Sequence, residues 1–173
     1  MTQSLPLLAL SVRQPWAWAI IHAGKNVENR DWVRTNPGMT YRGPVAIHAS
    51  QGMTRAEYDE AAAFMASIGV TCPPAIELQR GGIIGSVIVQ DIVRNRDMPG
   101  GDGNKFSPWF FGPVGLLLRK PVACEFVLAK GALGFFKWAA GDHLESQQPA
   151  RWMLPEQPTK AKQSKPEAQG TLL

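Results

Sequence analysis

The chain has 173 residues, of which 45% are hydrophobic and 18% are charged. This length fits one domain. The hydrophobic fraction allows a sizeable core, so a broadly disordered protein is excluded. The formal net charge is +4 at pH 7, which makes the protein mildly basic.

The positive charge lies in the first third of the chain. Residues 1–55 carry six basic side chains but only two acidic ones, Glu28 and Asp31, whereas residues 56–141 and 142–173 each balance the two signs. A basic excess that is clustered in this way indicates an anionic partner such as RNA or a nucleotide.

Composition excludes several other classes of protein. No apolar run approaches the roughly 20 residues of a membrane helix, and the N-terminus lacks the basic region and cleavage site of a signal peptide. Cys72 and Cys124 are too few for a disulfide framework or a zinc ribbon, and the 3 histidines lack metal-ligand spacing. We therefore expect a cytoplasmic protein that contacts no membrane. The sequence predicts no cofactor and does not require a metal ion, and it favours a monomer while leaving the oligomeric state open.

The first predicted elements are short. Leu7–Val12 is an apolar run that predicts a strand. Pro15 suits the first turn of a helix that Gly24 would end, because glycine readily adopts the conformation that follows a helix. Residues 25–32 have no helical periodicity and are expected to be extended, and Pro44–Ala49 is an apolar strand.

A second helix is predicted from residue 54. Thr54-Arg-Ala-Glu57 is a capping box, apolar residues follow it at helical spacing, and Gly69 ends the pattern. The strongest strand signal is Ile83–Val93, because this run is long and rich in Ile and Val.

The remaining elements are predicted to be strands. Val114–Leu118 and Val122–Leu128 are expected to be separated by Arg119-Lys120-Pro121, and the aromatic segment Gly131–Trp138 closes the domain. About six strands with two short flanking helices predict a mainly β (α+β) fold, a small barrel.

The domain is placed in residues 1–140. From residue 141 onward Pro, Gln, Lys, Ser and Glu dominate, and apolar periodicity is lost. Residues 141–173 are therefore predicted to be a polar, disordered tail.

Polar and aromatic residues are unusually dense between Leu10 and Trp32. Arg13 and Gln14 stand at the expected helix start, where they either cap the helix or reach an anion, which helix N-terminal N–H groups favour. Trp16, at helical spacing, is either a core residue or part of a binding platform.

Lys25, Glu28 and Arg30 form a second polar cluster. In an extended chain Glu28, Arg30 and Trp32 share one face. The cluster is either a solvated, salt-bridged strand or a set of polar groups in a barrel mouth. There a lysine beside a glutamate can bind a base edge or a phosphate, or activate a water.

Several short motifs follow one another along the chain. Leu10-Ser-Val-Arg-Gln-Pro-Trp16 precedes Gly24-Lys25-x-x-Glu28-x-Arg30, which looks like the signature of ASCH domains in the PUA-like superfamily. The resemblance continues in the right order through Tyr41–Ala49, Gly82–Asp91, Ser107–Pro113 and Gly131–Phe136.

This resemblance implies a PUA-like small β-barrel with a cleft lined by the Lys-x-x-Glu-x-Arg segment. ASCH domains are widely inferred to bind RNA, some are reported as ribonucleases, and one bacterial member is an amidohydrolase acting on acetylcytidine. In that amidohydrolase pattern the catalytic lysine is followed three residues later by a threonine nucleophile. Here Glu28 stands at that position, so the nucleophile is missing.

Other residues are carried over from the neighbouring motifs. The positions that match them, and that are expected to face the same cleft as Lys25, Glu28 and Arg30, are Arg13, Gln14, Trp16, His48, Asp91, Ser107 and Trp109. A buried Asp91 would need a cationic partner, for which Arg30 and Lys25 are the natural candidates.

The roles of His48 and of three aromatic residues each allow two interpretations. His48, in an apolar strand, is either a satisfied buried histidine or, within reach of Glu28, a general base. Trp109 and Phe110 are either packed onto the barrel or form a stacking platform for a base, and Trp32 can serve similarly.

Two functions from different classes follow. The first is an RNA- or nucleotide-binding module with a basic, aromatic-lined cleft. The second is a hydrolase of RNA or of a modified nucleoside, in which Lys25 and Glu28 are catalytic. We favour binding, because no nucleophile, base and orienting group form a recognisable set.

Overall fold

The computed structural model describes residues 4–156. One mixed sheet of six strands forms the body of the protein, in the order β2-β5-β4-β3-β1-β6. The elements are β1 (Leu8–Val12), α1 (Trp16–His22), β2 (Val27–Arg30), β3 (Gly43–Ala49), α2 (Arg55–Ser67), β4 (Gly82–Arg94), β5 (Val114–Leu128) and β6 (Phe135–Lys137), with short 3-10 turns between them.

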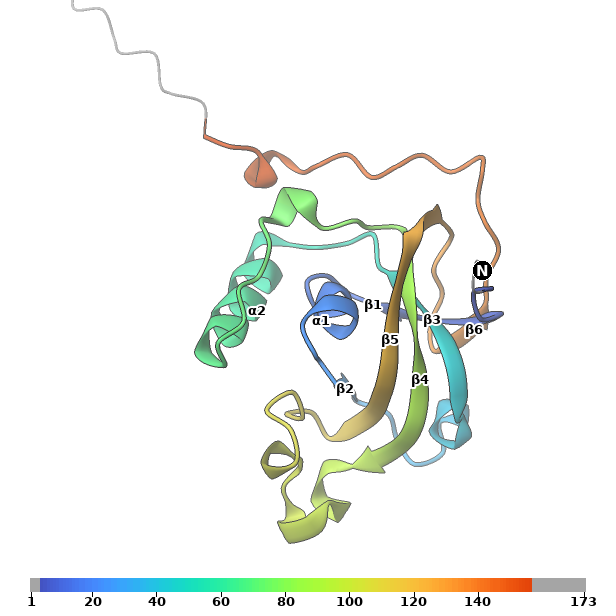
Figure 1. The fold of residues 1–173 in the computed structure, drawn as a ribbon, viewed down its shortest axis with the longest axis vertical. Coiled ribbons are helices and arrows are strands. Elements are labelled where there is room, and N and C mark those ends of the chain that lie inside the picture. Colours follow the sequence, from blue (N-terminus) through green and yellow to red (C-terminus); the bar gives the residue numbers. More distant parts are fainter. Residues whose placement is uncertain (1–3, 157–173) are drawn as a thin grey trace, which may run out of the picture.

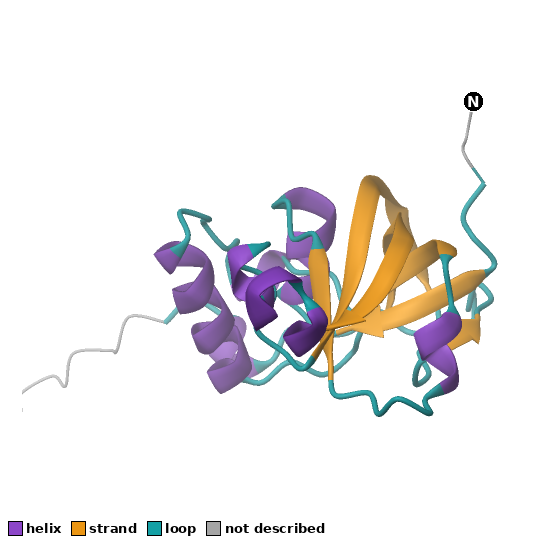
Figure 2. Cartoon of the chain, turned by 90° about the horizontal axis from the view of Figure 1, so that it is seen from below, coloured by secondary structure: helices purple, strands orange, loops and turns teal. Residues whose placement is uncertain are grey.

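The sheet curves strongly, and α1 and α2 lie on the same side of β4 and β5 (Figure 1). Seen from below, these helices form a layer beside the strands (Figure 2). β1 pairs in parallel with β3, and every other pair of neighbouring strands is antiparallel. The fold is therefore α+β, as predicted.

The predicted closed barrel is wrong, because the sheet is open between β2 and β6. β2 has 4 residues and pairs with β5, whereas β6 has 3 residues and pairs with β1. Such short edge strands offer little backbone for closing the ladder. Helix α1 supplies the missing apolar surface, since Ile20 and Ile21 belong to the main core cluster.

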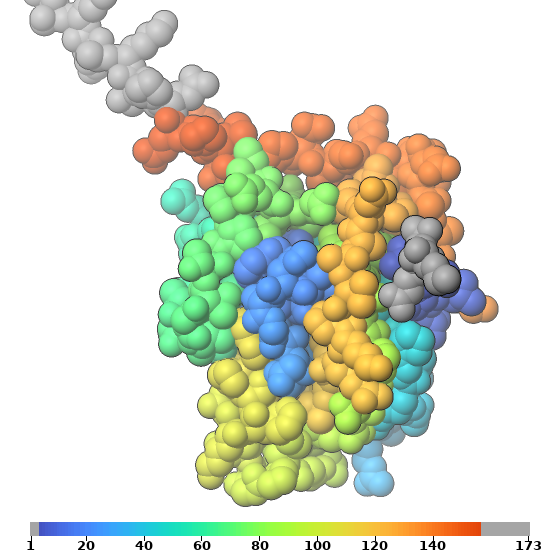
Figure 3. Space-filling view, viewed as in Figure 1, coloured from blue at the N-terminus to red at the C-terminus, as the bar shows by residue number. Residues whose placement is uncertain are grey.

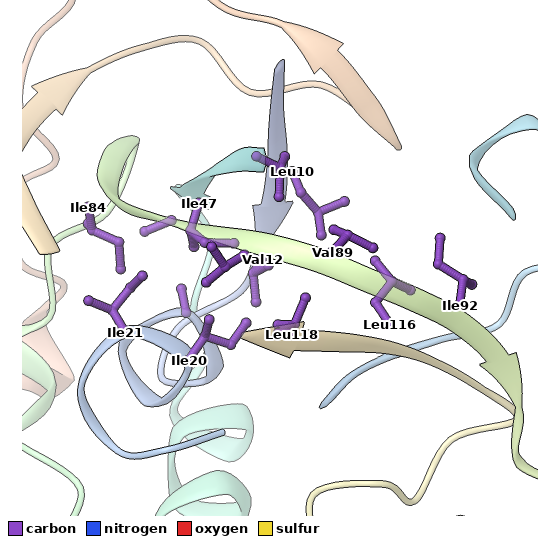
Figure 4. Packing of buried hydrophobic residues seen from close by; sticks show 14 of the residues in the cluster. Leu10, Val12, Ile20, Ile21, Ile47, Ile84, Val89, Ile92, Leu116 and Leu118 are labelled. Atoms are coloured by element: carbon purple, nitrogen blue, oxygen red, sulfur yellow. The ribbon is translucent and has the colours of Figure 1, made fainter. Parts of the chain in front are cut away.

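The main core lies between α1 and the concave face of the sheet. Figure 4 shows Ile20 and Ile21 of α1 pointing toward Val12, Ile84 and Leu118 of three strands. Burying an aliphatic side chain of this size contributes about 1.5–3 kcal/mol. This packing fixes α1, and the polar residues that follow it, against the sheet. In the space-filling view α1 lies between α2 and β5 (Figure 3).

The two strands predicted at 114–118 and 122–128 form one long strand, β5. Its pairing with β4 continues on both sides of Arg119-Lys120-Pro121, with a shift in register between Ser86 and Ile88. Lys120 has a positive φ of 51°, so the extra residue is accommodated as a bulge. The Arg-Lys-Pro segment bends the strand and does not end it.

The helix predicted from residue 54 is confirmed as α2. The Thr54 side chain accepts a hydrogen bond from the Glu57 backbone N–H, and the Glu57 carboxylate accepts one from the Thr54 N–H at 2.7 Å. Gly69 follows the helix with a φ of +81°.

The segment after residue 140 continues along the domain. Met153 is buried and packs in a small apolar cluster with Met53, Ala75 and Leu78. The domain boundary at residue 140 stays a prediction, and residues 157–173 of the predicted tail lie outside the described part of the chain. Within residues 4–156 no helix is long and apolar enough to cross a membrane.

An ion pair links the start of the α1 segment to α2. Arg13 donates to the Glu57 carboxylate at 2.7 Å. Together with the Thr54 N–H, Arg13 lowers the pKa of Glu57 from 4.5 to about 2. The side chains of Arg13 and Glu57 are 48% and 39% exposed, so solvent weakens the stabilisation that this pair supplies.

We predict that Glu57→Gln lowers the melting temperature slightly at neutral pH and that the difference from wild type disappears in acid. Because the folded-state pKa is depressed, the Glu57 contribution is present above pH 4.5 and is lost as pH falls toward 2. Melting curves between pH 7 and pH 2 measure it. Glu60→Gln, on the same helix, is the control, and a difference that persists at pH 2 would contradict the prediction.

Candidate nucleic-acid interface

Three charged side chains meet at the edge of the sheet. Lys25 Nζ donates to Glu28 Oε2 at 2.8 Å, and Arg30 Nη2 lies 3.3 Å from Glu28 Oε1. One carboxylate thus bridges two cations, and the cluster has one excess positive charge. The side chains of Lys25, Glu28 and Arg30 are 1%, 11% and 20% exposed, so the positive end that reaches solvent is Arg30.

Local structure places Lys25 inside the protein. Gly24, with a φ of +74°, reverses the chain after α1, and the Lys25 N–H donates back to Ala19 at 3.1 Å. Lys25 Nζ also donates to the carbonyl of Val27 on the edge strand β2. Burial lowers the pKa of Lys25, and the ion pair with Glu28 opposes that change. Lys25 is therefore held by internal partners.

Arg30 joins β2 to β1 across the open side of the sheet. Its Nη2 donates to the Ser11 carbonyl at 2.8 Å, and its Cζ lies 5.8 Å from the centre of the Trp32 ring. Its Nε is buried and has no hydrogen-bond partner among the described residues. A buried N–H without a partner costs free energy, so Nε is a local weakness of the cluster, and only the exposed part of the Arg30 side chain is open to a ligand.

Ser11 extends the polar contacts to His48 on β3. The Ser11 hydroxyl donates to His48 Nδ1 at 3.2 Å when His48 Nε2–H donates to the Ala129 carbonyl at 2.8 Å. This tautomer is assigned from the carbonyl, which can only accept. His48 is 2% exposed, and burial lowers its pKa, so the ring is neutral at pH 7. Both nitrogens are thus satisfied within the protein.

The other polar side chains of the predicted site lie in different surroundings. Gln14 is buried, where its amide donates to the Gln79 carbonyl at 2.8 Å and accepts from the Trp18 N–H at 2.9 Å. Asp91 is half exposed and pairs with Arg42 at 2.7 Å. The expected Asp91 partners, Arg30 and Lys25, are occupied by Glu28 instead.

An aromatic cluster lies beside Lys25. Lys25 Nζ is 5.8 Å from the centre of the Trp16 ring, and Trp16 packs with Phe64, Trp109 and Phe111 at centroid distances of 5.7, 6.5 and 5.7 Å. Trp16 is therefore partly buried as a core residue, and it also contacts an exposed aromatic residue, Phe111.

The predicted stacking platform needs a correction. Trp109 and Phe110 are 5% and 0% exposed, so neither ring presents a face to a base. The exposed aromatic residue of this segment is Phe111, at 51%. The three aromatic residues are consecutive, and the sequence alone did not distinguish which one faces solvent.

Two asparagines of the signature fasten this aromatic segment. Asn26 accepts a hydrogen bond from the buried Ser107 hydroxyl at 2.5 Å. Asn29 donates to the Trp109 carbonyl at 2.8 Å and accepts from the N–H groups of Phe111 and Gly112 at 3.1 and 2.9 Å. Both asparagines lie at the variable positions of Lys-x-x-Glu-x-Arg, which sequence reasoning passed over.

A second aromatic cluster lies beside Arg30. Trp32, under the Arg30 guanidinium, packs against Phe135 with ring centres 5.7 Å apart, and Phe135 packs against Tyr41 at 4.5 Å. The ion cluster is therefore flanked by aromatic rings at both ends. Within the described residues, no group of three or more His, Cys, Asp or Glu side chains is placed to hold a metal ion.

Comparison with known proteins identifies the family. The ASCH domain model matches residues 10–108, which is more than half of the chain, so the protein belongs to the ASCH domain family. The resemblance of the sequence motifs is thereby confirmed. Among solved structures, the chain is similar to ASCH from Zymomonas mobilis, with 16% identity, 70% of this chain and 72% of that chain covered, and a TM-score of 0.36. No curated protein sequence matches.

We predict that Glu28→Gln lowers the free energy of unfolding by about 3 kcal/mol, because it leaves the buried Lys25 and the partly buried Arg30 without their shared carboxylate. Urea unfolding measures the change. The matched control is Asp59→Asn, which removes an exposed partner of Arg55 at 3.7 Å and should have almost no effect. Equal losses in the two variants would show that the buried cluster is not stabilising.

Proposed function

We propose that this protein binds single-stranded RNA and that Arg30 contacts a phosphate of the strand. ASCH domains are widely inferred to bind RNA. The observation that carries the proposal here is Arg30, the partly exposed cation of a buried cluster with one excess positive charge.

The guanidinium of Arg30 suits a phosphate ligand. Its Nη2 is used by Ser11 and Glu28, whereas its buried Nε has no partner among the described residues. A planar guanidinium can donate two parallel hydrogen bonds to phosphate oxygens. A phosphate at the exposed part of the Arg30 side chain would neutralise the excess charge of the cluster.

Lys25 and Glu28 serve in this proposal as positioning residues. Glu28 is held by Lys25 at 2.8 Å, and its other oxygen lies near Arg30. The guanidinium is therefore oriented before the ligand arrives, which lowers the entropy cost of binding. Trp32, beneath Arg30 at 5.8 Å, adds an aromatic surface of the kind on which unpaired RNA bases stack.

A hydrolase is the second candidate function. The observation that favours it is the buried contact between Lys25 and Glu28, since a carboxylate beside a lysine in low-dielectric surroundings can act as a general base. Both oxygens of Glu28 already face cations, however, one Lys25 and the other Arg30, so neither oxygen is left free to take a proton from a water. Binding without turnover therefore ranks first.

We predict that Arg30→Ala weakens binding of a labelled single-stranded RNA roughly tenfold, the loss typical of a hydrogen bond to a charged group. Fluorescence anisotropy at several salt concentrations measures it, and the slope of log K against log salt should fall by about 0.7 for one lost phosphate contact. Arg30→Lys keeps the charge and should retain part of the affinity.

The matched control for this measurement is Arg55→Ala. Arg55 lies on α2, its side chain is 70% exposed, and it has one exposed ion-pair partner, Asp59. The same charge is lost, but away from the cluster, so the affinity should stay nearly unchanged. Equal weakening by the two variants would mean that RNA senses only the net charge, and the Arg30 site would be rejected.

The hydrolase is tested by turnover. We predict that single-stranded RNA and acetylcytidine are recovered intact after incubation with the wild-type protein. If either is hydrolysed, Glu28→Gln decides the mechanism. Loss of several orders of magnitude in rate, in a variant whose melting curve still shows a folded protein, would establish Glu28 as a catalytic base and overturn the binding-only function.

A further inference from the structure

A hollow of about 650 Å³ opens between the segment before β3 and the segment before β6. Its lining comes from two parts of the chain, namely Asn36, Pro37, Gly38, Thr40, Tyr41 and Arg42 from the first and Leu133, Gly134 and Phe135 from the second. Its volume is in the range of small-molecule sites, about 300–1,000 Å³. The rings of Tyr41 and Phe135 supply an aromatic wall.

Trp32 lies next to both Arg30 and two residues that line this hollow, Phe135 and Gly38. Phe135 packs against Trp32 at 5.7 Å, and Gly38 lies so close to Trp32 that an added Cβ would come within 2.8 Å of that ring. Trp32 in turn lies 5.8 Å from the Arg30 guanidinium carbon. A strand of RNA that contacts Arg30 therefore has to pass Trp32 before one of its bases enters the hollow.

The charge around the hollow favours an anionic ligand. Residues 30–42 and 130–137, which contain its lining, carry five basic side chains, Arg30, Arg34, Arg42, Lys130 and Lys137. Three acidic side chains oppose them, namely Asp31 and the two carboxylates that pair with Arg30 and Arg42, Glu28 and Asp91. The other exposed aromatic surface, around Phe111, lies in residues 95–113, where two basic side chains balance two acidic ones. Charge complementarity thus selects the hollow over the surface at Phe111 for a nucleic acid.

The lining can also contact the polar edge of a base. Asn36 Oδ1 accepts from the Gly38 N–H at 2.8 Å, which leaves its amide nitrogen as a donor. The Thr40 hydroxyl donates to Pro37 at 3.1 Å, which leaves its oxygen as an acceptor. A nucleobase, flat and polar at its rim, matches this combination better than an aliphatic side chain does.

We propose that the hollow is a nucleobase-binding subsite, in which a base of the RNA strand stacks on the Tyr41 and Phe135 wall. This inference rests on the proposed function, because the strand whose base enters the hollow is the one whose phosphate contacts Arg30. Tyr41 and Phe135 are then RNA-contacting residues, neither of which belonged to the site expected from the sequence.

The test compares two neighbouring phenylalanines of β6. Phe135 lines the hollow, whereas Phe136 packs in a different apolar cluster with Ala9 and Ala46. We predict that Phe135→Leu weakens binding of a labelled oligouridine at least about fivefold, the lower end for one lost stacking contact. Phe136→Leu should leave the affinity nearly unchanged. Melting curves confirm that both variants are folded.

A second probe is an oligonucleotide of the same length without bases. The wild type should bind it at least about fivefold more weakly than oligouridine, and Phe135→Leu should abolish that difference. Thr40→Trp, which fills the hollow from an exposed position, should act like Phe135→Leu if the latter fails to fold. Its control is Thr35→Trp, at an exposed position outside the lining.

The outcomes separate the two proposals. If Arg30→Ala weakens RNA binding but Phe135→Leu and Thr40→Trp leave it unchanged, the base subsite is rejected and the proposed function stands. If Phe135→Leu instead affects only the binding of an apolar dye, the hollow is a protein-docking surface, which also overturns the subsite. If the wild type binds no RNA at low salt, both proposals fail.

Discussion

The pairing of both Lys25 and Arg30 with the single carboxylate of Glu28 is the interaction on which the site depends. Lys25 and Arg30 both lie against this carboxylate, and each also holds a backbone carbonyl, Lys25 that of Val27 and Arg30 that of Ser11. The second of these bonds joins β2 to β1 on the side where the sheet fails to close. A side chain thus makes the connection that a ladder of backbone hydrogen bonds would make in a closed barrel, and one face of that side chain remains open to solvent.

The two ends of the ion cluster differ in what surrounds them. At the Lys25 end, Trp16 packs against buried aromatic rings. These rings hold α1 against α2 and against the segment that Asn29 fastens. At the Arg30 end, Trp32 packs against Phe135, which lines the open hollow. The Lys25 end is therefore buried inside the domain, and the partly exposed Arg30 end is the one that we propose for the ligand. The short Lys-x-x-Glu-x-Arg segment thus contains both the buried ion pair and the exposed cation.

Local patterns predicted local structure well. The capping box at Thr54 depends on contacts within a few residues, and the strand at Ile83–Val93 is marked by a long run of Ile and Val; both were confirmed. The motif order likewise identified the family. Barrel closure was predicted wrongly, because it depends on the lengths of β2 and β6 and on α1 filling the concave face. The partner of Asp91 was also missed, since Arg42 lies on a neighbouring part of the sheet and not in the signature.

The charge distribution shows how the fold changes what the sequence alone indicates. In sequence, the positive excess belongs to residues 1–55, and residues 56–141 balance. In the structure, β6 pairs with β1 and brings Lys137 beside the basic N-terminal third, while Lys130 precedes the loop that lines the hollow. The acidic residues that balance these lysines in the count lie on other elements, such as Glu57 and Asp59 on α2. The fold thus adds Lys137 to the basic N-terminal third, which a count of charges by region of the sequence does not show.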